Sequence, residues 1–252
     1  MVMANQIVVT DNLISYSQSG AGDSAVIFLH GWRSQKEVWS GVVSRINDER
    51  LRIYSLDLPG FGGSSVPKEA LTVGDYAEIV KGFIEKHGLK NVCLVGHSFG
   101  GRVGIKMTAV YPDLILKLVL VDAAGFVTNE SKRRMFRYLA KLVKPIFKLS
   151  MMQGFRRKIY QFIGAEDYLA TPELQKTFVN VVNEDLTEDL KKINCPTLII
   201  FGENDNETPV EFGEKMHSLI SNSRFEILPD TGHFSFLDKP EEFAKVLIDF
   251  IV

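Results

Sequence analysis

The residues most able to do chemistry in this sequence are a serine, a histidine and an aspartate at three separate turns. Ser98 lies in the segment Gly96-His-Ser-Phe-Gly100, which follows the apolar run 91–95 and precedes a helical stretch that ends at Pro112. Glycines on both sides of a serine leave room for a crowded strand-to-helix turn, and such a turn presents the hydroxyl above the sheet edge. The pattern predicts a nucleophilic serine, with a glycine-rich packing turn as the alternative.

A nucleophilic serine needs a base, and the chain offers five histidines. His233 lies on a glycine-containing turn after the last predicted strand, where no helix or strand accounts for it. His30 and His97 flank tight turns, His87 ends a helix, and His217 belongs to an amphipathic helix. We interpret those four as structural. His233 is the predicted base, with a capping role as the alternative. No two histidines have the spacing of a metal motif such as HExxH, so neither a metal nor a cofactor is predicted.

The acid that would orient His233 has two candidates. Asp205 follows the penultimate predicted strand, and Asp122 follows the strand after the serine turn. Asp205 preserves the chain order serine, aspartate, histidine, and we favour it for that reason. Either aspartate could instead cap a helix, which is the role that we favour for Asp122.

An acyl-transfer site also needs two backbone N–H groups that converge on the developing oxyanion. Phe99 directly follows the serine and is predicted to supply one. The loop after the apolar strand 25–29 is predicted to supply the other, from Trp32. His30, Gly31 and Trp32 are therefore predicted to line the substrate pocket, although plain core packing is an alternative for the Trp32 side chain.

Strands and helices alternate along most of the chain, which predicts an α/β fold with a mostly parallel sheet, flanked by helices. Reactive groups of such folds gather at the carboxyl ends of the strands, where the candidate residues above also lie. A capping box at Ser34 and Glu37 predicts one helix start, and Thr72 predicts another. The strands are expected over residues 7–10, 13–18, 25–29, 51–56, 91–95, 117–121, 196–201 and 224–228.

The alternation stops between residues 125 and 190, where no strand-like run occurs. This length is too great for a loop, so we predict a helical lid inserted into a core domain of residues 1–124 and 191–252. Residues 126–165 hold ten Lys or Arg against one acid. Arg134, Arg137 and Lys141 share one helical face. They form either a solvated surface or a docking patch for an acidic carrier, a CoA thioester or an anionic membrane surface.

Composition is ordinary for a globular protein of 252 residues, with 45% hydrophobic and 24% charged residues. No apolar run approaches the roughly 20 residues that span a bilayer, and the first residues lack a signal-peptide pattern. We therefore expect a cytoplasmic protein without a transmembrane segment, and its two cysteines to be reduced packing residues. The segment 60–65 lacks the phosphate-loop pattern, so no nucleotide or nucleic-acid partner is expected. The oligomeric state does not follow from the sequence.

Five short motifs carry a resemblance that covers the whole chain. They are His30-Gly-Trp32, Asp57-x-Pro-Gly-x-Gly-x-Ser64, Gly96-His-Ser-Phe-Gly-Gly101, Gly202-x-x-Asp-x-x-x-Pro209 and Gly232-His233. In this order they resemble the α/β-hydrolase superfamily, and within it the compact lid-bearing branch of esterases, C–C hydrolases, perhydrolases, haloalkane dehalogenases and epoxide hydrolases. The resemblance implies the α/β-hydrolase fold and a triad of Ser98, Asp205 and His233, but it leaves the substrate open.

Departures from the motifs of particular groups narrow the activity. Dehalogenases and epoxide hydrolases carry an aspartate nucleophile where this chain has Ser98. The meta-cleavage C–C hydrolases usually place tryptophan after the catalytic histidine, where this chain has Phe234, which is expected to contact substrate. The resemblance therefore implies an ester or thioester hydrolase that works through an acyl-enzyme on Ser98. A C–C bond hydrolase and a cofactor-free perhydrolase are the catalytic alternatives, and a ligand-binding receptor with this fold is the non-catalytic one.

Overall fold

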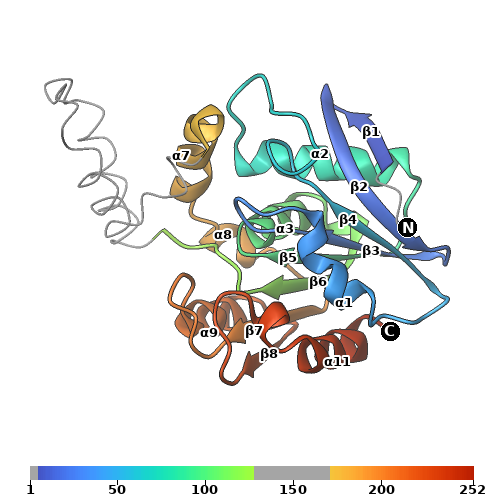
Figure 1. Ribbon diagram of the computed structural model, residues 1–252. Coiled ribbons are helices and arrows are strands. Elements are labelled where there is room, and N and C mark those ends of the chain that lie inside the picture. Colours follow the sequence, from blue (N-terminus) through green and yellow to red (C-terminus); the bar gives the residue numbers. More distant parts are fainter. Residues whose placement is uncertain (1–4, 128–170) are drawn as a thin grey trace, which may run out of the picture.

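The computed structural model describes residues 5–127 and 171–252, and these residues build one eight-stranded sheet flanked by helices (Figure 1). The strand order is β1-β2-β4-β3-β5-β6-β7-β8, with β1 and β2 antiparallel to their neighbours and the remaining strands parallel. This confirms the predicted α/β fold. The strands are β1 Asn5–Val9, β2 Asn12–Gly20, β3 Ser24–Leu29, β4 Leu51–Leu56, β5 Val92–His97, β6 Ile115–Val121, β7 Thr197–Gly202 and β8 Ser223–Leu228.

Alternation along each central strand divides the core into two layers. In β3, Ile27 and Leu29 face one cluster, whereas Val26 and Phe28 face the other. Because both faces of these strands are covered, they are apolar throughout, as the sequence pattern predicted. Parallel pairing then brings the carboxyl ends of β3, β5, β6 and β7 to one edge of the sheet.

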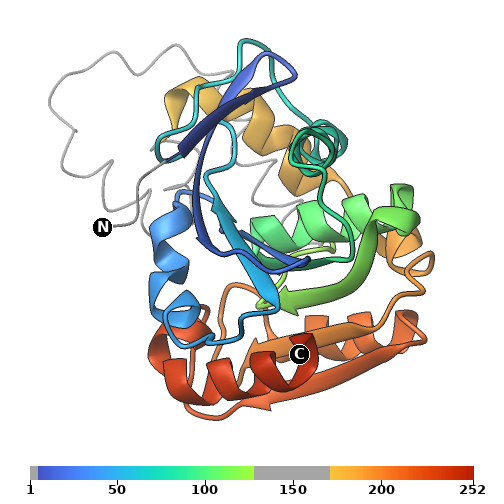
Figure 2. The ribbon, with the colours of Figure 1, turned by 90° about the vertical axis from the view of Figure 1, so that its right-hand side faces the viewer.

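Helices cover the two faces unequally. One layer contains α2, α3 and α9, and the other contains α1 and α11, which lie side by side in Figure 2. The helices of the core are η1 Lys36–Trp39, α1 Ser40–Val43, α2 Val73–Lys86, α3 Phe99–Val110, η2 Pro112–Leu114, α9 Val210–Leu219, α10 Ser235–Asp238 and α11 Pro240–Ile251. Within the described parts of the chain, every helix is too short or too polar to span a membrane.

The two predicted helix starts have different outcomes. Thr72 caps α2 through a complete capping box, in which its hydroxyl accepts a hydrogen bond from the Asp75 backbone N–H at 3.2 Å. The capping box predicted at Ser34 is wrong, because the helix there begins as a 3₁₀ turn whose N-cap, Gln35, makes no side-chain cap bond. Glu37 instead pairs with Lys36, at 2.9 Å between Oε1 and Nζ. The Glu37 carboxylate therefore forms an ion pair with the neighbouring Lys36 and does not cap the helix.

The predicted insertion lies partly outside the described residues, and so do Arg134, Arg137 and Lys141. Its described end, residues 171–190, is helical, with η4 Pro172–Leu174, α7 Gln175–Asn183 and α8 Thr187–Leu190. The Arg102 guanidinium of α3 holds this end to the core by donating to the Glu184 carbonyl at 2.7 Å, and the Leu186 N–H joins it to the start of the insertion by donating to the Gly125 carbonyl at 2.9 Å.

Candidate active site

Ser98 occupies a strained turn between β5 and α3. Its φ of 49° and ψ of −108° lie outside the regions that most residues with side chains adopt. Both neighbouring glycines are required, since a Cβ on Gly96 would lie 2.4 Å from the Gly100 carbonyl oxygen, and one on Gly100 would lie 2.4 Å from the Leu29 carbonyl oxygen. The Ser98 N–H donates to the Val121 carbonyl at 3.0 Å, which ties the turn to β6. The backbone therefore has the geometry of a nucleophile elbow.

His233 and Asp205 meet across two loops. Nδ1 of His233 lies 2.8 Å from Oδ2 of Asp205. The carboxylate also accepts hydrogen bonds from the backbone N–H groups of Glu207, at 2.7 Å, and Thr208, at 3.0 Å. The Thr208 hydroxyl donates to Oδ2 at 2.7 Å. These donors fix the carboxylate in one orientation, and its second oxygen is directed at the imidazole.

Electrostatics reinforce this pair. Burial alone would raise the pKa of Asp205, but the hydrogen bonds from His233 and Thr208 and the charge of His233 outweigh burial and lower it. Burial opposes protonation of His233, but its hydrogen bond to Asp205 and the charges of Asp205, Glu207 and Asp122 raise its pKa. An ionised Asp205 favours the tautomer with the proton on Nδ1 and leaves Nε2 as the basic nitrogen.

Asp122, the other candidate acid, is fully buried but makes different contacts. Its carboxylate accepts from the Gly202 N–H at 2.7 Å, and from the Ser235 hydroxyl at 2.7 Å and N–H at 3.2 Å. Burial raises its pKa to about 7. Asp122 thus ties the end of β6 to the loops that carry Asp205 and His233. Asp122 is therefore not a helix N-cap, because the N-cap of α10 is Phe234, and its carboxylate instead binds Ser235, the first residue of that helix.

His97 has a role that sequence reasoning missed. Its Nε2 donates to the His233 carbonyl oxygen at 2.7 Å, and the two imidazole rings lie 4.8 Å apart between centroids. Burial lowers the pKa of His97 to about 3, so its ring is neutral and the proton sits on Nε2. The one available signal was its position directly before Ser98, which a tight turn explained equally well.

The loop after β3 lies against the serine. A Cβ on Gly31 would lie 2.7 Å from Nδ1 of His97 and 3.4 Å from Cβ of Ser98, so only glycine allows this approach. The Trp32 indole packs edge-on against Phe99, with ring centroids 5.2 Å apart. As the first residue of α3, Phe99 carries a backbone N–H that has no acceptor within the helix.

His30 does not face the site. Its ring is fully buried, with Nδ1 donating to the Gly31 carbonyl at 2.7 Å and Nε2 accepting from the Leu58 N–H at 3.0 Å. Burial lowers the pKa of His30 to about 4, so the ring is neutral. Both ring nitrogens are used to shape the loop, and none is left for substrate.

A cavity of about 270 Å³ brings Ser98 and His233 together. Predicted pocket residues Gly31, Trp32 and Phe234 line it. Sequence reasoning missed three others, which are Arg33, His97 and Glu207. Within the described residues, no group of three or more His, Cys, Asp or Glu side chains is arranged to hold a metal ion.

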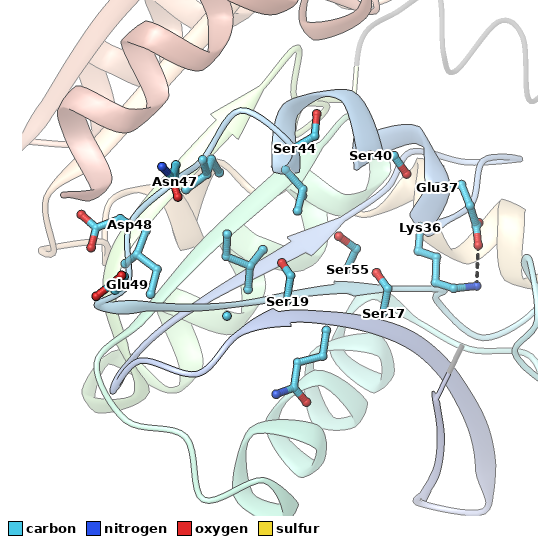
Figure 3. A pocket seen from close by; sticks show the side chains of 16 residues that line it. Ser17, Ser19, Lys36, Glu37, Ser40, Ser44, Asn47, Asp48, Glu49 and Ser55 are labelled. Atoms are coloured by element: carbon cyan, nitrogen blue, oxygen red, sulfur yellow. Dashed lines mark ion pairs between the residues drawn. The ribbon is translucent and has the colours of Figure 1, made fainter. Parts of the chain in front are cut away.

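A second cavity, of about 570 Å³, lies elsewhere, between α1 and the strands β2 and β4 (Figure 3). Serine side chains from both sides line its middle, and acidic side chains lie at its two ends. Neither Ser98 nor His233 reaches this cavity. The labelled residues are Ser17, Ser19, Lys36, Glu37, Ser40, Ser44, Asn47, Asp48, Glu49 and Ser55.

Comparison with known proteins agrees with this geometry. A family model described as the alpha/beta hydrolase family matches residues 26–246. The chain is 25% identical to a 2-hydroxy-6-oxononadienedioate/2-hydroxy-6-oxononatrienedioate hydrolase of Pseudomonas sp, covering 94% of this chain and 91% of that protein. It is 26% identical to the mouse (Mus musculus) monoacylglycerol lipase ABHD6, covering 90% and 75%. The solved esterase of Exiguobacterium antarcticum superposes with a TM-score of 0.80 at 27% identity, covering 99% of each chain.

Proposed function

Because the chain belongs to the α/β-hydrolase family and is a hydrolase, we propose that it cleaves a carboxylic ester or thioester through an acyl-enzyme on Ser98. His233 is the general base, Asp205 orients it, and the backbone N–H groups of Phe99 and Trp32 bind the oxyanion. The observation that carries this proposal is one cavity lined by both the strained Ser98 turn and the imidazole that Asp205 holds.

The reaction runs in two halves. Nε2 of His233 takes the proton from Oγ of Ser98 as the oxygen attacks the carbonyl carbon. The tetrahedral oxyanion is stabilised by the two N–H groups, and Nε2 then gives the proton to the departing alcohol or thiol. In the second half, His233 takes a proton from water. The resulting hydroxide attacks the acyl carbon, and Oγ of Ser98 leaves with the proton from His233.

The described end of the insertion supports a lid-like role in this function. Phe178 of α7 packs against the Trp32 indole, with 5.2 Å between ring centroids. Trp32 also contacts Phe61, at 4.9 Å. Of these three rings, that of Trp32 lines the cavity and gives it an apolar wall suited to an acyl chain. Docking of an acidic partner on Arg134, Arg137 and Lys141 stays a prediction.

C–C bond hydrolysis is the second candidate, because the hydrolase of Pseudomonas sp named above cleaves oxo-dienoate compounds by its name. The same triad could act on such a substrate. Perhydrolysis needs only a different attacking oxygen, from hydrogen peroxide, on the same acyl-enzyme.

Turnover of p-nitrophenyl esters of graded acyl length tests the proposal, with a 2-hydroxy-6-oxo-dienoate and a peracid-formation assay run in parallel. We expect ester turnover that Ser98→Ala abolishes, and a kcat/KM for the best ester well above that for the dienoate. Dienoate cleavage that outpaces every ester would replace the proposal with the C–C activity. Firm ligand binding without steady-state turnover of any substrate would indicate the receptor.

A further inference from the structure

Glu207 lies in the loop between β7 and α9, two residues after the proposed catalytic acid. Its backbone N–H donates to Oδ1 of Asp205 at 2.7 Å, so the same carboxylate that orients His233 also fixes where the Glu207 side chain begins. The side chain is 68% exposed, yet it lines the cavity that contains Ser98 and His233. A charged, solvated group is thereby held at the mouth of the site.

The Glu207 carboxylate faces the reactive nitrogen of the base. Its Oε2 lies 3.6 Å from Nε2 of His233, whereas Nδ1 on the other side of the ring is engaged by Asp205. In the proposed reaction Nε2 gives its proton to the departing group. The departing alcohol therefore receives its proton beside Glu207.

A carboxylate in this place acts differently on differently charged alcohols. At separations of about 4–6 Å a negative charge repels another and attracts a positive one, and solvent exposure limits each effect on kcat/KM to about fivefold or less. Arg33, whose φ is 56°, lines the same cavity. Its charge is common to the parent and to any Glu207 variant, so a comparison of the two isolates the effect of Glu207.

We propose that Glu207 is a specificity-determining residue, which makes the site discriminate against esters of anionic alcohols in favour of esters of cationic alcohols. This inference rests on the proposed ester hydrolysis and names the alcohol side of its substrate class. Such a preference would also distinguish this protein from an enzyme whose departing fragment carries a carboxylate.

Three esters with one shared acyl group test it, made from choline, from its neutral isostere 3,3-dimethylbutanol and from 3-hydroxypropanoate. The acyl group is the best one in the p-nitrophenyl series. The measured quantity is the ratio of kcat/KM for the choline ester to that for the 3-hydroxypropanoate ester, with the neutral ester as the reference. We expect Glu207→Gln to reduce the ratio about tenfold, because attraction and repulsion both disappear, and Glu207→Lys to reduce it further. In the parent, 0.5 M salt should reduce the ratio in the same direction.

The matched control is Glu211→Gln, four residues further along. Glu211 is exposed in the first turn of α9 and does not line the cavity, so this variant makes the same change in net charge without touching the site. Its ratio should equal that of the parent. Equal reductions in both variants would mean that net charge is responsible and would overturn the inference.

A second readout is the pH dependence of kcat/KM on the neutral ester. The groups that face the His233 ring are Asp205 and Glu207 from the β7–α9 loop, Asp122 from the loop directly after β6, and His97 from β5. Glu207→Gln should move the acid limb to lower pH, because one of the charges that raise the pKa of His233 is gone. If Glu207→Gln changes neither the ratio of kcat/KM for the two charged esters nor the acid limb of the pH profile, the inference is overturned. The proposed function still stands in that case, provided that Ser98→Ala is inactive. Absence of ester turnover in the parent would overturn both.

Discussion

Two of the cavities formed by the described residues differ in a way that size does not predict. The larger, of about 570 Å³, lies beside the sheet under α1, and the smaller, of about 270 Å³, lies at the carboxyl ends of the parallel strands. The larger has hydroxyls on its walls, and charged groups near its ends pair with one another, as Lys36 does with Glu37 and Asp48 with Arg50. The smaller has a basic nitrogen whose ring is held by a buried carboxylate.

Backbone strain marks the same difference. Arg33 and Ser98, which both line the smaller cavity, have φ values of 56° and 49°. Among the residues that line the larger one, only Gly20 has a positive φ, which costs glycine little. Residues with strained backbone angles persist only where the surrounding structure fixes them, and they are concentrated at functional sites. The candidate active site therefore differs from the larger cavity in the fixed backbone geometry of its lining residues and not in a greater volume.

The largest expected effect comes from removing the nucleophile or the base. Ser98→Ala and His233→Ala should each reduce kcat on the best ester by about 10⁴- to 10⁶-fold, and the double variant should lose little more, because the two groups act as a unit. An organophosphate should label Ser98 in the parent, detectable by mass spectrometry of the digest. Ester turnover by Ser98→Ala near that of the parent would place the chemistry elsewhere.

The next largest loss of activity is expected from replacing Asp205, the acid of the proposed triad. Asp205→Asn should keep the fold but favour the wrong His233 tautomer, reducing kcat by roughly 10⁴-fold. Asp122→Asn keeps one acceptor oxygen for its backbone and hydroxyl donors, and should reduce kcat only about tenfold, through looser loops. Steady-state kinetics of the two variants, with circular dichroism to check folding, decides between them. A reversed order would assign the role of the acid to Asp122.

A smaller effect is expected on pH dependence. The base must be neutral, so activity falls as pH drops through the pKa of His233, which lies above its ordinary value. Asp205→Asn removes the hydrogen bond and charge that do most to raise this pKa. The acid limb of the residual kcat/KM should therefore move to lower pH. A limb that moves to higher pH in this variant would mean that another group controls it.

The smallest effect should come from the larger cavity. Ser19→Leu fills part of it from β2 without removing any ion pair, and should change kcat/KM on the best ester by less than about twofold. The same leucine introduced at Gly31 should abolish activity, because even a Cβ there collides with His97. A large loss from Ser19→Leu would show that the two cavities are coupled, and the comparison above would fail.

Local pattern was sufficient to predict the fold and to select two candidates, Ser98 and His233, which line one cavity. Apolar strands covered on both faces, glycines around Ser98 and the Thr72 cap are effects of neighbouring residues, and each has the predicted form. The candidate base could be selected from the sequence because no local element used His233. The capping box at Ser34 failed because Lys36, held by Asp57 at 2.7 Å, competes for Glu37.

Tertiary structure decided what depends on residues far apart in the chain. Asp205 and Asp122 both follow parallel strands, and only loop packing directs one at His233 and the other at Ser235. The His97 bond to the His233 carbonyl spans 136 residues, and the approach of Glu207 to Nε2 requires two loops to meet. No periodicity or spacing encodes these contacts, because each depends on where separate strands end in space once the sheet has formed.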